Sequence, residues 1–326
     1  MNAPTWRPAA DPAMLHARAR LLAQIRCFFA TAGVLEVETP VCSRYGTTDP
    51  AIESLRTRFT GPGAARGAPL YLQTSPEFPM KRLLAAGSGP IYQICRVFRD
   101  GELGPRHNPE FTLLEWYRPG FDHQALMDEV SALLNTLLPV SLTIQHLSYA
   151  EAFQRWLQVD PHTATPEALR TCAVRHGIAG AEDLELDSRD AWLDLLLSHL
   201  IEPQLGRDRI TYLYDYPATQ AALSRIRAGD PPVAERFELY LEGMEIANGF
   251  HELVDAREQR RRFEADNVTR TTRGLETVEM DQRLLAGLEA GLPDCSGVAL
   301  GIDRLLMVLT GQRDIRQVLA FPFESA

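Results

Sequence analysis

The sequence predicts an α+β fold in which an antiparallel sheet is flanked by helices. Two runs rich in β-branched and aromatic residues, IYQICRVF at 91–98 and EFTLLEWY at 110–117, are joined by a polar segment and indicate a hairpin. A second pair of strands is expected within RFELYLEGMEIANGFHEL at 236–253. A long helical stretch separates the two groups, which favours α+β over alternating βαβ units.

The first expected element is an amphipathic helix. It begins at Asp11, an N-cap followed by Pro12, and stops near Gly33. Its apolar residues recur at roughly helical spacing: Leu15, Leu22, Ile25 and Phe29. The next segment, VLEVETP at 34–40, has strand composition and closes at its proline.

A loop and a short helix are expected before the hairpin. The residues of GPGAARGAP at 61–69 are small or helix-breaking and predict a loop, and LYLQ after them predicts a short strand. Ser75-Pro76 opens a helix that we expect to reach Ala86, with Gly87 as its cap.

The middle of the chain, from about 122 to 205, is predicted to be mostly helical. Helix starts are expected at three places: a capping box of Ser148 and Glu151, Thr165-Pro166, and Asp187 or Ser188. Because no polar residues converge there, we interpret this block as a helical insertion within one domain of residues 1–326.

Strand and helix alternate towards the C-terminus. RITYLYDYP at 209–217 predicts a strand before the late pair, and Asp255 to Glu258 is expected to cap a helix through REQRRRFEADN. SGVALGIDRLLMVLTG at 296–311 predicts a strand, a tight turn and a closing helix.

Composition limits the class of protein. A formal charge of −10 over 326 residues gives no general attraction to nucleic acid. Five scattered cysteines without a CxxC pair suit a reducing cytosol. The N-terminus lacks an apolar signal core, and the longest apolar cluster, at 191–201, is too short for a bilayer, so we expect a soluble, cytoplasmic protein. Rossmann and P-loop glycine motifs are absent from the sequence.

Chemistry-bearing residues gather at the tip of the hairpin. Arg99 ends the first arm, and His107, Asn108 and Phe111 begin the second. A guanidinium group suits phosphate, and an aromatic ring can stack on a base. These residues favour a nucleotide-binding site at the hairpin tip. The alternative is a surface hairpin with scattered polar residues.

Two carboxylates, Glu245 and Glu252, lie in EIANGFHE. Their odd spacing would put them on opposite faces of a regular strand, but a bulge at Gly249 would bring them to one face. Together they would suit Mg²⁺ or a cationic substrate. The alternative is a pair of exposed acids on an edge strand.

Two further residues carry weaker signals. Arg304, just after Gly301 at the expected strand-to-helix turn, can meet phosphate or stack on a base. Glu77 in SPEFPMKRL is explained equally well as an acid at a helix start.

Taken in order, these segments resemble the catalytic domain of class II aminoacyl-tRNA synthetases, most closely lysyl-tRNA synthetase, over residues 10–325. GVLEVETP resembles motif 1, VFRDGELGPRHNPEFTLLEWY motif 2 and GVALGIDRLLMVLTG motif 3. SPEFPMKRL and EIANGFHELVDAREQRRRF resemble segments specific to lysyl enzymes.

The resemblance implies a role for each matching residue. Arg99 and Arg304 would be catalytic, Phe111 and Arg304 would enclose the adenine, and Glu245 would face ATP and Mg²⁺. The implied ATP contacts are Arg99, Asp100, Gly101, Glu102, His107, Asn108, Phe111, Glu245, Ile246, Gly301 and Arg304. The implied amino-acid contacts are Ser75, Glu77, Tyr117, Asn248 and Glu252.

Three features depart from the lysyl-tRNA synthetase pattern. Gly101 stands where motif 2 has glutamate, so Glu102 comes one residue late, and either Glu102 or a backbone group would have to serve the adenine. Ala299 stands where glycine is usual, which hints at an altered substrate. The first motif begins near residue 11, which leaves no room before it for an anticodon-binding domain.

The length and architecture of the chain resemble those of the lysyl-tRNA synthetase paralogues that modify elongation factor P, and the segments AREQRRRF and ERFELYLEGMEIANGFHEL fit that subfamily. The resemblance therefore implies ATP- and Mg²⁺-dependent activation of (R)-β-lysine, or of lysine, and transfer to a lysine of that factor. It also implies a homodimer formed through the first helix and strand, with tRNA unlikely as a partner. Aminoacylation of tRNA, amidation and a non-catalytic regulatory paralogue are the alternatives.

Overall fold

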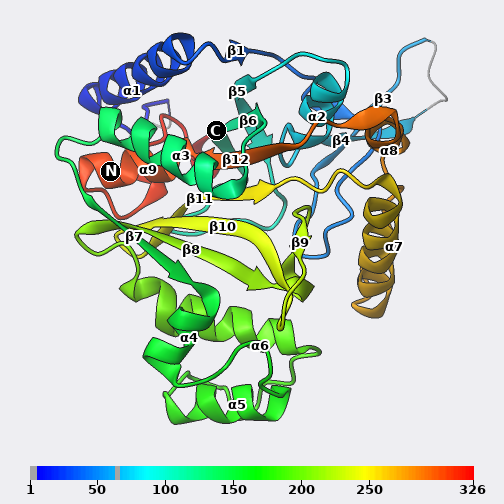
Figure 1. The fold of residues 1–326 in the computed structure, drawn as a ribbon. Helices are drawn as coiled ribbons and strands as arrows, with labels where there is room; N and C mark the ends of the chain where they lie inside the picture. Colours follow the sequence, from blue (N-terminus) through cyan, green and yellow to red (C-terminus); the bar gives the residue numbers. More distant parts are fainter. Residues whose placement is uncertain (1–5, 63–66) are drawn as a thin grey trace. The chain divides into compact units, whose positions relative to one another are not determined.

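A computed structural model describes residues 6–62 and 67–326 and confirms the α+β fold (Figure 1). The chain forms two compact units. The first holds residues 1–120, 253–295 and 299–326, and the second holds 121–252 and 296–298. Part of the expected loop, residues 63–66, lies outside the described residues. Within the described ranges, no helix combines the length and apolar character needed to cross a membrane.

The first unit is built on the predicted hairpin. β5 (Ile91–Phe98) pairs antiparallel with β6 (Glu110–Pro119), and β1 (Leu35–Glu36) pairs parallel with β5. The predicted first helix is α1 (Pro12–Thr31), capped by the Asp11 side chain. Phe29 of α1 is fully buried and stacks on Tyr92 with 4.4 Å between ring centroids, so the helix covers the hairpin through aromatic packing.

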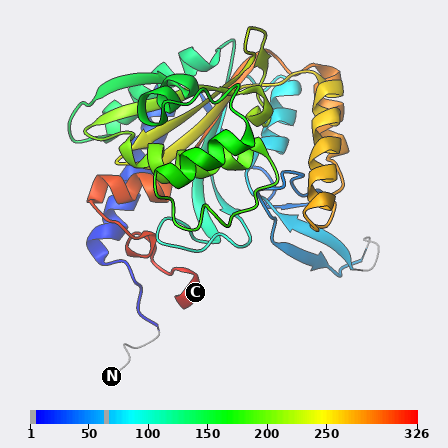
Figure 2. The ribbon, with the colours of Figure 1, turned by 90° about the horizontal axis from the view of Figure 1, so that it is seen from below.

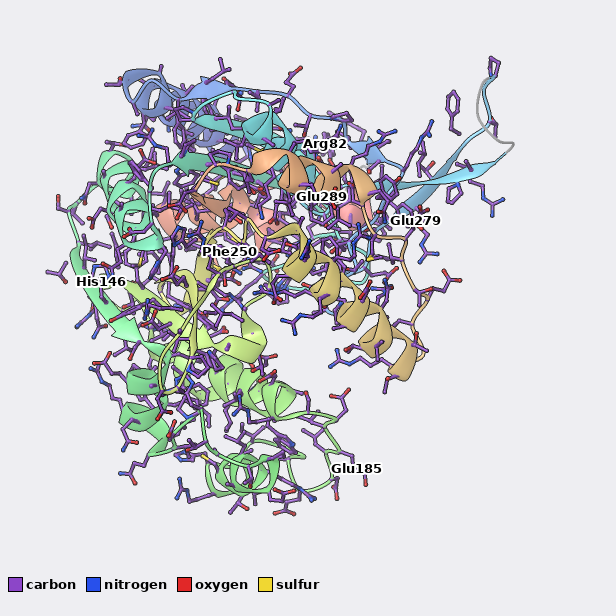
Figure 3. All side chains as sticks on the ribbon, turned by 45° about the vertical axis from the view of Figure 1, so that its right-hand side comes forward. Arg82, His146, Glu185, Phe250, Glu279 and Glu289 are labelled. Atoms are coloured by element: carbon purple, nitrogen blue, oxygen red, sulfur yellow. The ribbon has the colours of Figure 1, made fainter. Side chains whose placement is uncertain are left out.

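A small sheet and three helices complete the outer part of this unit. The sheet runs β2 (Cys42–Ser43), β4 (Ala68–Leu72), β3 (Arg56–Phe59). The helices are α2 (Glu77–Ala85), α7 (Ala256–Thr272) and α8 (Gln282–Gly291). Phe78 of α2 contacts Phe263 of α7 at 5.9 Å, and the two helices lie side by side in Figure 2. Gly287 of α8 faces Arg82 of α2, which is labelled in Figure 3.

The closing strand and helix follow the predicted order. Residues 296–298 of β12 (Cys295–Gly301) belong to the second unit. Gly301 is then the N-cap of α9 (Ile302–Thr310). Asp303 is buried, accepts a hydrogen bond of 2.7 Å from the Thr112 backbone and pairs with Arg18 of α1. This carboxylate thus fixes the start of α9 against β6.

The second unit carries the late strands. β10 (Val233–Leu241) pairs antiparallel with β11 (Met244–His251) and with β8 (Arg209–Pro217), and β9 (Ile226–Arg227) also pairs with β10. β7 (Thr143–Ser148) runs parallel to β8. The helix α3 (His123–Leu137) packs on β10 and β11.

The predicted helical block gathers beyond β7 and β8 in Figure 1. It contains α4 (Tyr149–Leu157), α5 (Pro166–Arg175) and α6 (Arg189–Leu196), followed by a π-helical turn at Leu197–Ile201. The Ser148 and Glu151 capping box is present, and Ser188 rather than Asp187 caps α6. The strand β7 was not anticipated in this block.

The expected bulge at Gly249 is wrong in position. Gly249 pairs regularly with Phe237, whereas Leu239 opposes Ala247 and Tyr240 opposes Glu245, so Ile246 is the extra residue. A Cβ on Gly249 would lie 2.4 Å from the Phe237 ring. The glycine is therefore required by close packing, and the bulge lies three residues earlier.

Candidate active site

The hairpin tip is closed by its own backbone. Arg99 N–H donates to Pro109 at 2.9 Å, and Gly104 and His107 exchange backbone hydrogen bonds of 3.1 and 3.2 Å. The predicted tip residues Arg99, His107 and Phe111 are thereby held at one end of β5 and β6. The tip is a shaped turn and can position side chains.

Arg99 is held from several directions. Its guanidinium lies 5.1 Å above the centre of the Phe111 ring, and it donates to the Thr74 carbonyl at 3.5 Å. The Glu102 carboxylate accepts from it at 3.4 Å. The cation and the aromatic ring that were predicted to serve a nucleotide therefore lie in contact with each other.

The turn at residues 100–102, where the sequence departs from the motif 2 pattern, depends on Gly101 for its backbone conformation. Gly101 has a φ of +78°, a conformation that side chains with a Cβ rarely adopt. The Asp100 backbone N–H donates to the Glu53 carbonyl at 2.9 Å. The Glu102 carboxylate is directed at Arg99, so its charge offsets that guanidinium in this structure.

Arg304 reaches the same tip from α9. Its guanidinium donates to the Arg106 carbonyl at 3.2 Å and to His107 Nε2 at 2.7 Å. Desolvation first, and then the Arg304 cation, lower the pKa of His107. His107 is therefore a neutral acceptor beside Arg304. Two predicted residues that are 197 positions apart in the sequence meet here.

Asn108 is buried, and both ends of its amide are engaged. Its nitrogen donates to the Glu110 carbonyl at 2.7 Å, and its oxygen accepts from the Phe323 backbone at 3.0 Å. The amide therefore ties the hairpin tip to the C-terminal segment.

The predicted amino-acid contacts of this unit converge on a residue that was not predicted. Glu115 of β6 is 2% exposed and accepts hydrogen bonds of 2.7 Å from both Ser75 Oγ and Tyr117 Oη. Ser75 Oγ also accepts from the Glu77 backbone N–H at 3.0 Å. The Glu77 carboxylate, one turn of helix away, pairs with the buried Lys81 at 2.6 Å.

The remaining predicted residues lie on or just after β11 in the second unit. Because of the bulge at Ile246, Glu245 and Asn248 oppose Tyr240 and Glu238, and so project to one face of the strand. Asn248 accepts from Arg236 at 3.3 Å. Glu252, 1% exposed, follows β11 and bridges to Ser224.

The residues fit the groups that the resemblance implies. Arg99 and Arg304 give the hairpin tip two cations, the donor set that a polyphosphate requires. Glu245 offers the carboxylate oxygen that Mg²⁺ prefers. Gly301, at the start of α9, and the half-buried Ala299 lie on the strand that leads to Arg304.

Three supporting residues escaped the sequence reasoning: Glu115, Lys81 and Asp303. A signal exists for each, because one charged residue in LLEWY, and two adjacent charged residues in PMKRLL and in ALGIDRLL, interrupt an otherwise apolar run. A buried charge requires partners. The sequence did not reveal which partners those would be.

The chain is similar to known proteins over nearly its whole length. The model of the family described as tRNA synthetases class II (D, K and N) matches residues 5–325. A protein of Klebsiella pneumoniae (strain 342), named elongation factor P–(R)-beta-lysine ligase, is 52% identical over 99% of this chain and 98% of its own length. Proteins with the same name from Salmonella dublin and Salmonella paratyphi B are 52% and 51% identical, with the same coverage.

Proposed function

The chain belongs to the class II tRNA synthetase family, and we propose that it is an ATP-dependent ligase that joins (R)-β-lysine, or lysine less well, to a lysine side chain of elongation factor P. The observation that carries this proposal is 52% identity over 99% of the chain to a ligase of that name. The family match spans residues 5–325, which supports one synthetase-like catalytic domain.

In the first step, a carboxylate oxygen of the amino acid attacks the α-phosphorus of ATP, and the bond to the leaving pyrophosphate breaks. Charge grows on the phosphate oxygens, and Arg99 is proposed to stabilise it from the hairpin tip. Arg304 is proposed to act from α9, where the neutral His107 leaves its cationic charge intact. Mg²⁺, when bound, would neutralise charge between phosphates, with Glu245 as a proposed ligand.

The residue types of the proposed amino-acid contacts suit a substrate with two ammonium groups. Glu252 is a buried carboxylate, and Glu77 is a carboxylate whose charge Lys81 already offsets. Ser75 and Tyr117 are locked by Glu115, so their hydroxyl groups need no reorganisation when a substrate binds. Buried ammonium groups require such acceptors, which supports a lysine-like substrate.

In the second step, the acceptor amine attacks the acyl carbon, AMP leaves, and the amine loses a proton. No protein nucleophile is required. The five cysteines all lie among the described residues and none of them forms a disulfide, which supports a reducing cytoplasm. The exposed Leu15 and Leu35, on α1 and β1, support a homodimer through these elements.

The reaction can be tested in three linked assays. ATP–pyrophosphate exchange is measured with lysine and with (R)-β-lysine, the mass of elongation factor P is measured after incubation, and tRNA charging is measured in parallel. We expect exchange with both amino acids, a mass increase on the factor and no charged tRNA. Absence of exchange with either amino acid would overturn the ligase proposal, and charging of tRNA without a change in the factor would overturn the acceptor.

The role of the hairpin tip can be tested separately by Arg99→Ala. We expect exchange to fall by about a hundredfold or more, because a charge-stabilising donor is lost. Arg96→Ala is the matched control, since Arg96 lies on the same strand and pairs only loosely, at 3.6 Å, with Glu110. Equal rates for the two variants, with both folded by circular dichroism, would show that Arg99 does not serve ATP.

A further inference from the structure

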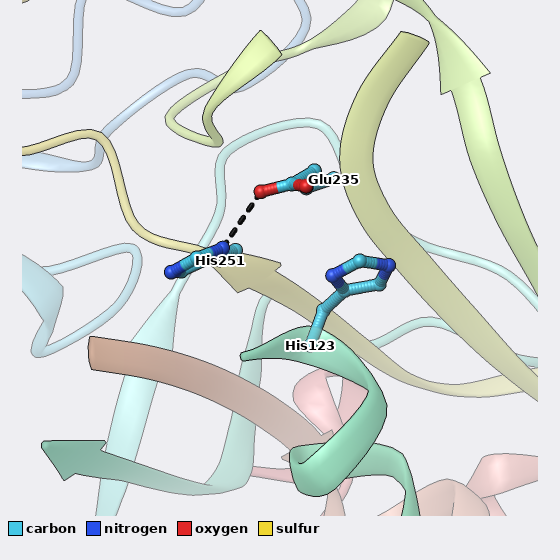
Figure 4. A group of neighbouring side chains, drawn as sticks. All are labelled: His123, Glu235 and His251. Carbon is cyan, nitrogen blue, oxygen red and sulfur yellow. Dashed lines mark hydrogen bonds and ion pairs between the residues drawn. The ribbon is translucent and has the colours of Figure 1, made fainter. Parts of the chain in front are cut away.

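Three potential metal ligands gather within the second unit, apart from the residues assigned above. They are His123 at the start of α3, Glu235 on β10 and His251 at the end of β11 (Figure 4). One nitrogen or oxygen atom from each lies within 4.8 Å of the others. Their elements are far apart in the sequence, so the fold itself assembles this group.

Local structure explains why the three side chains meet. Arg236 of β10 pairs with Phe250 of β11, so the adjacent residues Glu235 and His251 are cross-strand neighbours. Their side chains project to one face of the strand pair, and those of the Arg236–Phe250 pair project to the other. The helix α3 packs on these two strands, and Asp122 caps it, so that His123 occupies the first helical position. The His123 ring therefore lies beside the carboxylate and the second imidazole.

His123 is buried in a way that its protein surroundings do not explain. Its side chain is 3% exposed, and within residues 6–62 and 67–326 neither ring nitrogen has a hydrogen-bond partner. Leaving such a group unpaired in the interior is costly, and native proteins rarely do so without a reason. One ring nitrogen lies on the side that faces Glu235 and His251 (Figure 4).

The other two side chains already form an ordered pair. His251 Nδ1 and Glu235 Oε2 lie 2.7 Å apart. The carboxylates of Glu235, Asp215 and Asp122 act electrostatically on the His123 ring, whereas Arg227 is the cation that opposes them. Arg227 is engaged by Asp215 at 2.5 Å and by Glu235 at 3.5 Å. The carboxylates outnumber this cation, which favours a bound cation near the ring.

We propose that His123, Glu235 and His251 bind one divalent transition-metal ion of the zinc class. Two imidazoles and one carboxylate form a typical three-residue zinc ligand set, with the fourth position left to water. Ligands of a tetrahedral zinc ion lie about 3.3 to 3.5 Å apart, so ligand atoms that lie within 4.8 Å of one another must approach by at most about 1.4 Å. When the metal binds at His251 Nδ1, the ring takes the tautomer that carries its proton on Nε2, so no proton remains between Nδ1 and Glu235.

The bound metal would join α3, β10 and β11 at one point. The His251 carbonyl accepts from the Arg225 backbone at 2.8 Å, so the same strand end is already anchored on its other side. The site differs from the proposed Mg²⁺ contact at Glu245 in both place and ligand chemistry, since imidazole suits zinc, cobalt and nickel rather than magnesium.

Binding is tested with Co²⁺ on the metal-free, full-length protein. The exposed thiols of Cys27 and Cys42 are first replaced by serine, so that they do not bind the ion. We expect one Co²⁺ per chain, with the visible absorption of a tetrahedral site, displacement by Zn²⁺ and no competition from millimolar Mg²⁺. Co²⁺ that binds in several equivalents, or that Mg²⁺ displaces, would overturn the proposal.

The ligands are tested by substitution. His123→Leu and Glu235→Gln should each weaken Co²⁺ binding by at least about tenfold, whereas His176→Ala, at an exposed helix end, should not change it. Zn²⁺ should raise the melting temperature of the parent and of His176→Ala but not that of His123→Leu.

His123→Leu also has a metal-free readout. Because it removes two buried nitrogens that have no hydrogen-bond partner in the described part of the chain, the variant should melt at least as high as the metal-free parent. If it does not fold, Glu235→Gln, which can still contact His251, decides the question. Unchanged Co²⁺ affinity in a folded ligand variant would overturn the site.

Discussion

At the scale of single residues, Glu115 links the proposed substrate contacts. It is an acid within the apolar strand segment LLEWY, it is 2% exposed, and the hydroxyl groups of Ser75 and Tyr117 both donate to it. A carboxylate can accept both hydrogen bonds at once, which no other side chain of its size and shape can do. Glu115 is therefore a positioning residue for Ser75 and Tyr117.

This role predicts the effect of Glu115→Gln. The amide would present a donor to one of the two hydroxyl groups and so release Ser75 or Tyr117 from its position. We expect KM for the amino acid in pyrophosphate exchange to rise about tenfold, with little change in KM for ATP. Glu110→Gln, on the exposed start of the same strand, is the control. If Glu115→Gln changed only the thermal stability, Glu115 would have a structural role, and the positioning role would be contradicted.

Asp266 allows a prediction about pH. Burial raises the pKa of this α7 carboxyl, although Thr48 donates to it at 2.8 Å. The folded protein thus holds the proton more tightly than the unfolded chain, where the pKa is about 3.9, so this group lowers stability as pH rises through the folded pKa. Asp266→Asn keeps the acceptor for Thr48 and removes the charge.

We therefore expect Asp266→Asn to melt higher than the parent at pH 7 and to lose this advantage at about pH 2.5, where the parent carboxyl is protonated in both states. Glu264→Gln, an exposed acid on the same helix, serves as the comparison in the same scanning calorimetry. An equal gain at both pH values would indicate a cause other than titration of Asp266.

At the scale of elements, sequence signals predicted the starts of helices best. Asp11, Ser148, Thr165, Ser188 and Asp255 all cap the helices expected after them, because a cap is a local hydrogen bond between neighbouring residues. The strand at 34–40 shortened to the two residues of β1, and β7 was missed inside the helical block. Whether an extended segment becomes a strand depends on a partner that the local sequence does not contain.

The strand β11 shows why the position of a bulge is hard to predict from a glycine. The sequence predicted a bulge at Gly249, whereas the structure places it at Ile246 and uses Gly249 to admit the Phe237 ring. A glycine in a strand can mark either a bulge or the close approach of another group, and the sequence alone does not distinguish these two causes. A bulge at either position would change which side chains share a face of the strand. The observed bulge at Ile246 places Glu245 on the same face as Asn248.

Gly249→Ala tests the close approach. The added Cβ would lie 2.4 Å from Phe237 and 3.0 Å from Val298, both buried, so the core must shift. We expect a loss of about 1 to 3 kcal/mol in the free energy of unfolding, measured by urea denaturation. Gly274→Ala is not a clean control because its φ is +71°, whereas Gly104 has open space and no positive φ. A loss no larger than that of Gly104→Ala would contradict the packing argument.

At the scale of the whole molecule, the sequence identified the chemistry of the candidate site better than its internal contacts. Arg304 and His107 were predicted separately, and only the fold shows the 2.7 Å contact between them. The engagement of Asn108 with Phe323, and of Glu77 with Lys81, likewise depends on tertiary structure. Residue types indicate which ligand suits a site, but hydrogen-bond partners are set by segments that converge in space.

The charge of the whole molecule leads to a prediction about tRNA. With a net charge of −10, the chain has no general electrostatic attraction to a phosphate backbone, which is the main source of non-specific affinity for nucleic acid. Arg99 and Arg304 place two cationic groups at the hairpin tip, Arg99 from the hairpin itself and Arg304 from α9. The Glu102 carboxylate offsets the charge of Arg99. A polyphosphate of nucleotide size can use two such cations, whereas a duplex needs many along its length.

We therefore expect labelled total tRNA to show no saturable binding to the full-length protein at about 150 mM salt, with any association weaker than about 1 μM and lost as salt rises. The measurement is a filter-binding titration, with a lysyl-tRNA synthetase and its own tRNA as the positive control. Saturable binding that persists at high salt would require a shape-specific tRNA surface and would contradict a protein as the sole acceptor.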